Sequence, residues 1–439
     1  MEREDVQIVL HPDELPRKWY NILPDLPEPL PRPKDPEMGP SRVELLPKMM
    51  VKKCLEQEFS EQRWIKIPDE IIDLYIQAGR PRLLYRAKRL EKALKPPENK
   101  IKLYYKREDL SPTGSHKVNT ALAQVFYAAN EGYDTVCTET GAGQWGSALA
   151  YAASLMNLKS VVFWVRFTYN WKPGRRTLMK LYGAEVYPSP SNITETGREI
   201  LKKNPDHPGS LGIAVSEGLE FALTHENAVY CLGSVLNHVL LHQTIIGLEA
   251  RKQFELIDEY PDVMISCLGG GSNFGGFVLP FIGEILRGEI SKDIKFIAAQ
   301  TQAAPSLVGG EYRYDFADHA EKTPMLKMYT LGHKKEMPTV YAEGLRYHAA
   351  APIISLLRHK GIIDAVAYPI DERHVFERAR LFIKSEGFLP APESAYSIAC
   401  AIDEALKAKK NNEEKVIAFN ISGHGFVDLS AYQKILFEN

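Results

Sequence analysis

The sequence has few cysteines, and their placement excludes two classes of protein. Five cysteines are scattered along 439 residues, at positions 54, 137, 231, 267 and 400. An odd number without any C-x-x-C pair indicates neither a zinc site nor a disulfide framework. We therefore expect no metal ligand set, and a reducing compartment such as the cytoplasm.

An excess of charge of one sign is also lacking. Lysine and arginine total 54 and aspartate and glutamate total 56, which gives a formal net charge of −2. This balance favours neither nucleic acid nor an anionic membrane as a partner. The first residues, MEREDVQ, are charged and lack the apolar core of a signal peptide, which again favours the cytoplasm.

A continuous apolar run of membrane-spanning length is absent as well. The uncharged stretch 263–283 contains six glycines and Pro280. A transmembrane helix needs a more continuous apolar surface. We predict a buried strand, a tight loop and a helix here, and no membrane partner.

Proline, in contrast, is abundant near the N-terminus, with nine prolines in residues 12–40. Such spacing prevents regular structure and favours extended chain, although a disordered tail is the alternative for this composition. Against a disordered tail stand five apolar anchors: Trp19, Tyr20, Ile22, Leu23 and Leu26. We expect residues 1–45 to form an extension packed on the surface.

From about residue 101, strand-like and helix-like segments alternate. Six short apolar runs are typical of buried parallel strands: IKLYYK, DTVCT, SVVFWV, DVMISCL, IKFIAAQ and KVIAFNI. Helix-length segments lie between several of them: ALAQVFYAANEG, RTLMKLYG and LHQTIIGLEARKQFEL. The alternation predicts an α/β fold with helices on both faces of mainly parallel sheets, and ligand sites at the carboxyl ends of the strands.

Two glycine loops follow strands. The first, TETGAGQWGSAL at 138–149, has the G-x-G-x-x-G spacing of a dinucleotide site. Such a site also needs a carboxylate at the end of the next strand, but the run SVVFWV is followed by Arg166. An arginine could bind only a dinucleotide that carries a 2′-phosphate, which weakens the dinucleotide hypothesis without excluding it. The second loop, LGGGSNFGG at 268–276, offers successive backbone N–H groups that suit a phosphate, or it is a turn without a ligand.

A lysine suggests which ligand the loops share. Lys117 lies where a Ser- and Gly-containing loop enters an Ala-rich helix. A lone lysine is usually a solvated charge, but a desolvated lysine forms a Schiff base with a carbonyl cofactor. Pyridoxal 5′-phosphate needs such a lysine, a cradle for its phosphate and a partner for its ring nitrogen.

Seven segments occur in a fixed order: GRP (79–81), KREDL-x-x-TGSHKVN (106–119), ETGAGQWG (139–146), YGAEV (182–186), GGGSN (269–273), EGFLPAPESA (386–395) and SGHG (422–425). In these segments the chain resembles the tryptophan synthase β chains, which are fold type II pyridoxal-phosphate enzymes. The Pro-rich N-terminus and the 190–220 region are similar to the divergent second class of this family. The resemblance implies two three-layer α/β domains with the cofactor between them.

The resemblance also implies domain boundaries. Residues 46–225 would form an N-terminal domain, including a mobile closing region at about 132–220. Residues 226–439 would form a C-terminal domain, to which residues 83–115 contribute.

The resemblance further implies roles for cofactor-binding residues. Lys117 would form the Schiff base, His116 would lie near the phosphate, and Asn119 would hydrogen-bond the pyridoxal 3′-oxygen. Ser422 would face the ring nitrogen, with Glu393 close to the ring. The phosphate would be bound by Gly269, Gly270, Gly271, Ser272 and Asn273.

The implied reaction is β-replacement, in which indole and L-serine give L-tryptophan through an aminoacrylate. Glu139 would be the acid–base residue. A hydroxyl such as that of Ser422 does not favour a protonated ring nitrogen, which suits β-replacement better than transamination. The amino-acid carboxylate would be held by Thr140, Gly141, Ala142, Gly143 and Gln144.

Two positions depart from the family pattern. Trp145 stands where the family usually has histidine, and Arg346 where it usually has an aspartate that contacts the substrate hydroxyl. An arginine beside the leaving group favours an anionic one, because a guanidinium forks onto phosphate oxygens. We therefore hypothesise a preference for O-phospho-L-serine. The alternative is that Arg346 points to solvent or pairs with a carboxylate such as Glu343.

The resemblance also implies a homodimer and allows a monovalent cation; contact with an α subunit is possible but would be weak or transient. Three other functions remain open. A serine or threonine dehydratase would share the lysine and phosphate loop. An NAD-linked oxidoreductase would make Lys117 dispensable, and a non-catalytic subunit would need none of these residues.

Overall fold

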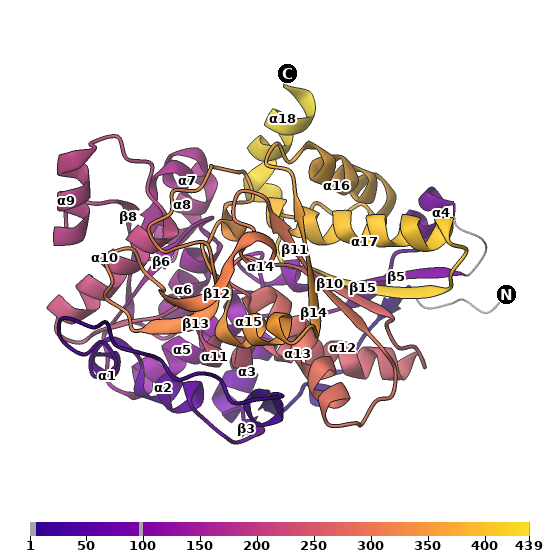
Figure 1. Cartoon of the computed structure of the whole chain (residues 1–439), viewed down its shortest axis with the longest axis horizontal. Coiled ribbons are helices and arrows are strands. Elements are labelled where there is room, and N and C mark those ends of the chain that lie inside the picture. The colour runs from indigo at the N-terminus through magenta and orange to yellow at the C-terminus, as the bar shows by residue number, and fades with distance from the viewer. Residues whose placement is uncertain (1–5, 96–99, 439) are drawn as a thin grey trace.

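The computed structural model describes residues 6–95 and 100–438. Two mainly parallel sheets with helices packed against them form an α/β fold. Figure 1 shows the elements of the smaller sheet on the left and those of the larger sheet on the right. The fold class predicted from the alternating pattern is confirmed.

The larger sheet has seven strands in the order β1-β4-β5-β15-β10-β11-β14. The last five are parallel to one another, whereas β1 and β4 are antiparallel to their neighbours. β15 lies between β5 and β10, and it therefore joins the two halves of the sheet. The bounds are β1 (Gln7–Ile8), β4 (Leu84–Arg86), β5 (Ile101–Arg107), β15 (Lys415–Ile421), β10 (Val263–Cys267), β11 (Lys295–Thr301) and β14 (Ile363–Tyr368).

Alternate residues of β10 face two different hydrophobic cores. Met264 packs in the core that contains α12 (Ile245–Leu256) and α13 (Ser272–Leu286). Val263 and Ile265 pack in the core that contains α16 (Arg373–Glu386) and α17 (Pro392–Lys410). Because successive strand residues point to opposite faces, helices cover both faces of the larger sheet.

The smaller sheet has four parallel strands in the order β8-β7-β6-β9. These strands are β8 (Glu185–Ser189), β7 (Lys159–Val165), β6 (Thr135–Thr140) and β9 (Ala228–Tyr230). The helices that pack most extensively on them are α6 (Gln144–Leu155) and α10 (Leu211–Thr224). Phe163 and Trp164 of β7 lie in the core of this sheet.

The N-terminal segment packs on the molecule through its aromatic residues. Trp19 and Tyr20 are buried on β2 (Lys18–Tyr20), which pairs with β3 (Trp64–Lys66). The backbone N–H of Tyr20 donates to Thr244 Oγ1 at 3.1 Å. This stretch therefore lies against the junction of α11 (Asn237–Gln243) and α12.

The remaining elements connect these layers. The remaining helices are α1 (Leu46–Met49), α2 (Lys52–Glu58), α3 (Asp69–Gln77), α4 (Lys88–Leu94), α5 (Val118–Asn130), α7 (Arg166–Trp171), α8 (Pro173–Leu181), α9 (Glu195–Lys203), α14 (Ser306–Gly309), α15 (Pro352–His359) and α18 (Leu429–Phe437). A hairpin is formed by β12 (Glu311–Phe316) and β13 (Met325–Thr330). Short 3₁₀ turns are η1 (Pro12–Glu14), η2 (Leu23–Asp25), η3 (Glu108–Leu110), η4 (Glu343–Leu345) and η5 (Phe426–Asp428).

All six predicted strands are present, and the stretch 263–283 is a strand, a loop and a helix as predicted. Within the ranges the structure describes, none of the helices has both the length and the hydropathy that crossing a membrane requires. The helical segment expected over 241–256 is confirmed, although it comprises the end of α11 and the whole of α12, which meet at Thr244.

Candidate active site

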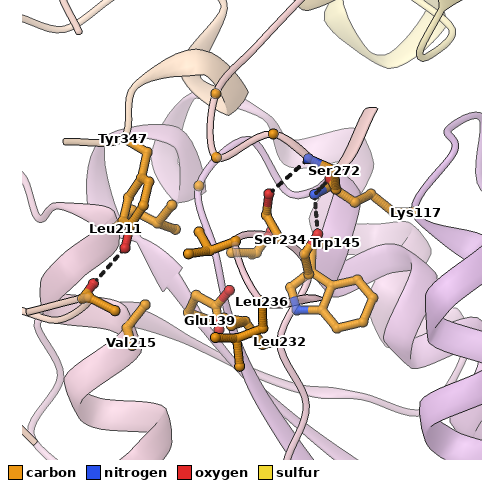
Figure 2. Close-up of a pocket in the computed structure, with 18 of the residues that line it drawn as sticks. Lys117, Glu139, Trp145, Leu211, Val215, Leu232, Ser234, Leu236, Ser272 and Tyr347 are labelled. Carbon is orange, nitrogen blue, oxygen red and sulfur yellow. Dashed lines mark hydrogen bonds between the residues drawn. The ribbon is translucent and has the colours of Figure 1, made fainter. Parts of the chain in front are cut away.

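One cavity collects most of the side chains expected to act together. It lies where four strands end: β6 leads to Glu139–Gln144, β9 to residues 233–236, β10 to residues 269–273, and β15 to Ser422. Parallel strands bring their carboxyl ends to the same edge of a sheet, which places loops distant in sequence side by side. Figure 2 labels ten of the lining residues.

Lys117 enters the cavity from the start of α5, where it precedes Val118. Its ammonium donates to the carbonyl of Gly233 and, at 3.0 Å, to Ser272 Oγ. Removal from bulk water lowers the pKa of Lys117 to about 8, although the nearby Glu139 opposes this shift. A lysine with this pKa provides a substantial fraction of neutral amine near neutral pH.

The second glycine loop passes close to other backbone and side-chain atoms. A Cβ on Gly269 would collide with the carbonyl oxygen of Gly344, and one on Gly270 would come within 2.6 Å of Ser234 Oγ. Gly271 has φ +118° and is followed directly by α13, which begins at Ser272. The loop therefore presents backbone and a helix N-terminus to the cavity, an arrangement that attracts an anion.

His116 and Ser422 lie beside this loop. His116 Nε2 is 3.3 Å from Ser272 Oγ, and burial lowers the pKa of His116 well below its usual value. The imidazole is therefore neutral. Ser422 Oγ lies 2.8 Å from Ser394 Oγ, and Cys267 Sγ lies 3.5 Å away. The cavity thus contains an uncharged hydroxyl at the end of β15.

Glu139 occupies the apolar part of the cavity. Figure 2 shows its carboxylate among the following lining residues: Leu211, Val215, Leu232 and Leu236. Burial raises the pKa of Glu139 to about 7, and hydrogen bonds from Tyr230 and Thr138 oppose that rise. A carboxyl group with this pKa exchanges protons readily at neutral pH.

The first glycine loop is fixed by the strand beside it. Trp164 Nε1–H donates to the Gly141 carbonyl at 2.8 Å, and Thr168 Oγ1–H donates to the same oxygen at 2.5 Å. Gly143 has φ +91° and precedes α6. Thr140, Ala142 and Gln144 line the cavity with Gly141.

Glu393 connects this loop to the opposite wall of the cavity. Its Oε2 accepts from Gln144 Nε2 at 2.9 Å, and its Oε1 accepts from the Gly344 N–H at 3.0 Å. Trp145 lines the cavity beyond Gln144, and its Nε1–H donates to Thr138 Oγ1 at 2.5 Å. The indole ring of Trp145 is therefore fixed at the base of the loop.

Three predicted site residues lie outside the cavity lining: Asn119, Gly143 and Arg346. Asn119 Nδ2 donates to Gln243 Oε1 at 2.9 Å, and its Oδ1 accepts from Arg80 Nε at 3.1 Å. Successive residues of a helix are about 100° apart around its axis. Asn119 follows Lys117 by two residues, so the two side chains point in nearly opposite directions. Its amide belongs to a buried polar network behind α5.

Arg346 pairs with Glu343, which is the alternative considered from the sequence. The guanidinium Nε lies 2.8 Å from both carboxylate oxygens of Glu343, and Nη1 donates to the Met337 carbonyl at 3.1 Å. Both side chains are buried, and Glu343 rather than Arg346 lines the cavity. The pair has no net charge. The cavity wall at Glu343 is therefore less positive than it would be if Arg346 were unpaired.

A comparison with protein families identifies the chain. The family described as pyridoxal-phosphate dependent enzyme matches residues 76–423. A tryptophan synthase beta chain 2 from Methanothermobacter thermautotrophicus is 56% identical over 426 residues, which cover 97% of each chain. This chain belongs to the tryptophan synthase β family.

Other relatives in the family agree. The tryptophan synthase beta chain 2 of Pyrococcus furiosus is 52% identical over 98% of this chain and 95% of its own length. The protein of that name from Aeropyrum pernix is 54% identical over 97% of this chain and 94% of its own. A fungal L-serine ammonia-lyase from Rhizomucor miehei has the same fold, with a TM-score of 0.58 at 16% identity, covering 80% of this chain and 96% of the lyase.

The cavity fits pyridoxal phosphate, the cofactor of the family. Lys117 supplies an amine beside Ser272, and an added side chain at Gly269 or Gly270 would meet other atoms of the cavity wall. The helix N-terminus after Gly271 suits the phosphate, and the hydroxyl of Ser422 is uncharged. The aldehyde, the phosphate and the ring nitrogen of the cofactor therefore each have a matching group on this chain, whereas Asn119, expected at the 3′-oxygen, lies outside the cavity lining.

Several lining residues were not found from the sequence. Tyr230, Ser234 and Tyr347 line the cavity, as do the four apolar residues around Glu139. Tyr230 closes the short strand AVY, which carries no motif, and Tyr347 follows Arg346 in a loop. The one signal that could have found them was their place in the fold. Tyr230 ends and Ser234 follows a strand that is parallel to the strand of Glu139, so both lie at the same edge of the sheet.

Proposed function

We propose that this chain makes L-tryptophan from indole and L-serine by pyridoxal-phosphate-dependent β-replacement. The observation that carries the proposal is the apolar chamber around Glu139, which lies on the same cavity as Lys117. A chamber of leucine and valine side chains with one carboxylate suits a flat apolar ligand that bears a single N–H. The names of the relatives above agree with this reaction.

Ten residues would hold the cofactor. Lys117 would carry it, residues 269–273 would bind its phosphate, and His116 would lie beside that phosphate. Ser422 would face the ring nitrogen, with Glu393 near the ring. Asn119 would act from behind α5 through its network with Gln243. When bound, the cofactor supplies an electron sink for bonds at the amino acid's α-carbon.

The first glycine loop would bind the amino-acid donor. Its carboxylate would lie against Thr140, Gly141, Ala142 and Gln144, and Gly143 would shape the turn. Glu393 restrains Gln144 through the 2.9 Å hydrogen bond, so the donor side of the cavity is preorganised. Trp145 would close the base of this subsite, in place of the histidine usual in the family.

Two side chains would move protons. Lys117 Nζ would take the proton from the donor's α-carbon, because its pKa of about 8 leaves part of the amine neutral. The Glu139 carboxyl would assist departure of the donor's β-substituent and then accept a proton from indole, because its pKa of about 7 allows both directions. The apolar walls would exclude water during these steps.

Borohydride reduction followed by peptide mass spectrometry tests the cofactor's attachment. We expect a pyridoxyl group on Lys117, and tryptophan formation from indole and serine by the same preparation. The variant E139Q is the matched control, because it should keep the label at Lys117 while losing most of the activity. An intact holoprotein labelled on a different lysine would refute the assignment.

We also propose that O-phospho-L-serine is the preferred amino-acid donor and that serine is used less well. The Glu343–Arg346 pair would govern this preference. Release of Arg346 from Glu343 would present a guanidinium to a phosphate. We expect R346A to lower kcat/KM for O-phosphoserine more than for serine. R358A is the control, because Arg358 lies on α15 and bonds the Ile363 carbonyl at 3.0 Å. An unchanged donor ratio in R346A would remove this role.

The remaining assignments follow the family resemblance. We propose an N-terminal extension of residues 1–45, a domain of 46–225 with a closing region at about 132–220, and a domain of 226–439 joined by 83–115. β9 would accompany the N-terminal domain because it pairs with β6. We further propose a homodimer, a bound monovalent cation, at most weak contact with an α subunit, and a cytoplasmic location, which the five free thiols suit.

A further inference from the structure

Glu139 and Tyr230 lie on neighbouring parallel strands of the smaller sheet. β6 and β9 pair with Cys137 opposite Tyr230, so the two side chains meet at the carboxyl end of the sheet. The phenol of Tyr230 donates to Glu139 Oε2 in a short hydrogen bond. Tyr230 is 3% exposed and Glu139 is 4% exposed, so water competes little for this contact.

A second hydroxyl lies near the same oxygen but has a better acceptor elsewhere. Thr138 Oγ1 is 3.1 Å from Glu139 Oε2 and 2.5 Å from the Cys231 carbonyl. A hydroxyl has one proton, and the shorter distance favours the carbonyl. The indole N–H of Trp145 already occupies the acceptor side of Thr138. Tyr230 is therefore the principal donor to Oε2.

The other carboxylate oxygen lacks a side-chain donor of this kind. Within the described part of the chain, the side chains that donate to Glu139 are Tyr230 and Thr138, and both donate to Oε2 rather than to Oε1. The neighbouring walls are leucine and valine side chains, which offer no donor. Oε1 is thus the oxygen that remains for a ligand in the chamber.

We propose that Tyr230 is a positioning residue that binds Glu139 Oε2 and leaves Oε1 as the atom that exchanges protons with the substrates. This inference rests on the role proposed for Glu139 and deepens it. The phenol stays protonated, because burial and the adjacent carboxylate raise the pKa of Tyr230 well above its usual value. It therefore acts as a permanent donor and not as a second acid.

The charges around Glu139 give the direction of the expected effect. Burial raises its pKa, and the Tyr230 hydrogen bond is the largest influence that lowers it. Its own backbone N–H, the Thr138 hydroxyl and Lys117 also lower it. The other groups that face Glu139 are two buried thiols, Cys137 and Cys231, and the phenol of Tyr347. Burial keeps those three groups neutral. Removing the Tyr230 hydroxyl therefore raises the pKa of Glu139.

The variant Y230F tests this directly. We expect the titration midpoint of Glu139, followed by difference infrared spectroscopy and assigned with E139Q, to rise by roughly one unit, as suits one hydrogen bond to a charged acceptor. The pH at which kcat/KM for indole rises should move upward equally, because indole addition needs the carboxylate form. KM for serine should stay constant, since the donor loop is untouched.

Y127F is the matched control. Tyr127 is buried and its hydroxyl accepts from Gln57 Nε2 at 3.2 Å, away from the cavity, so its removal should leave the Glu139 titration unchanged. T138V should shift the midpoint less than Y230F does. A larger shift in T138V, or an unshifted midpoint in folded Y230F, would overturn the proposal.

A third variant tests the same hydrogen bond if Y230F does not fold. Replacement of Tyr230 by 3,5-difluorotyrosine retains the ring and strengthens the donor, so the midpoint should fall instead of rise. The infrared titration uses no substrate. A wild-type protein that forms no tryptophan would therefore defeat the proposed function, while an upward shift in Y230F would still support the contact.

Discussion

Both glycine loops of the cavity end in a glycine with positive φ that precedes a helix, Gly143 before α6 and Gly271 before α13. The surroundings differ. Gly143 packs on the side chains of Trp164 and Arg175, whereas Gly269, at the start of the second loop, packs on the backbone of Gly344. At Gly143 the first loop lies against side chains from β7 and α8, whereas at Gly269 the second loop lies against the main chain of the 3₁₀ turn η4.

This difference indicates how each loop tolerates change. A side chain can rotate or be replaced, so the first loop can vary with the donor that it binds. A backbone contact is available only to glycine, whatever the neighbouring side chains are. We therefore expect the second loop to be the less tolerant of the two.

The largest effect is expected for Gly269→Val. The added side chain collides with the Gly344 carbonyl oxygen, and neither backbone segment can rotate away. We expect the Kd for pyridoxal phosphate to rise at least about 100-fold, close to 2.7 kcal/mol. Equilibrium titration of the apoprotein with the cofactor measures this.

Gly309→Val provides the control for that variant, because a Cβ there meets only Pro305 at 3.7 Å. Cofactor affinity should match the wild type in this control. Tight cofactor binding by Gly269→Val would show that the backbone around Gly344 moves to accommodate the side chain. The two loops would then not differ in their tolerance of substitution.

A smaller effect is expected for Gly143→Val. A branched residue is disfavoured at φ +91°, and its Cβ would come within 2.6 Å of the Trp164 ring. We expect KM for the amino-acid donor to rise about tenfold, or 1.4 kcal/mol, with full cofactor content. Steady-state kinetics with serine and cofactor absorbance measure the two quantities.

Gly183→Val separates backbone strain from crowding in that experiment. Gly183 has φ +85°, and nothing lies within 4 Å of an added Cβ. This control should lose stability without any change in donor KM. Loss of cofactor from Gly143→Val would mean that the two loops do not act separately.

The smallest effect is expected for Trp164→Phe. The change removes the 2.8 Å hydrogen bond to the Gly141 carbonyl, while Thr168 continues to donate to the same oxygen. A net loss of about 1 kcal/mol corresponds to roughly a fivefold rise in donor KM. Trp64→Phe, on exposed β3, is the control for the loss of an indole ring. An equal donor KM in the two variants would show that the Trp164 hydrogen bond does not contribute to donor binding.

Local sequence patterns were sufficient to predict both glycine loops and six parallel strands, but the parallel strands β8, β9 and β14 were missed. Buried parallel strands are short apolar runs, and their ligands lie where the strands end. The contact of Thr244 with Tyr20, more than 200 residues earlier, was not predictable in this way, because it depends on the tertiary fold. The β12–β13 hairpin was missed, although EYRYDF alternates polar and aromatic residues.

The side chains that surround the motifs were harder to predict. Asn119 belongs to a motif, but the rotation of α5 directs it into the network with Arg80 and Gln243. For Arg346, the sequence offered both a substrate phosphate and a neighbouring carboxylate, and only the three-dimensional arrangement distinguishes them. Motifs therefore indicated which loops meet, and packing decided which side chains face the cavity.

The position of β15 has a consequence for biosynthesis. A ribosome makes β5 and β10 long before β15, which begins at Lys415 of 439 residues. Until that strand emerges, the two halves of the larger sheet have no shared strand, and both carry an open edge that invites wrong pairing. Lys117 and the loop after β10 are therefore brought into register only after β15 has been made. We expect the cofactor site to form no earlier than that, and the open edges of β5 and β10 to be exposed to wrong pairing until then.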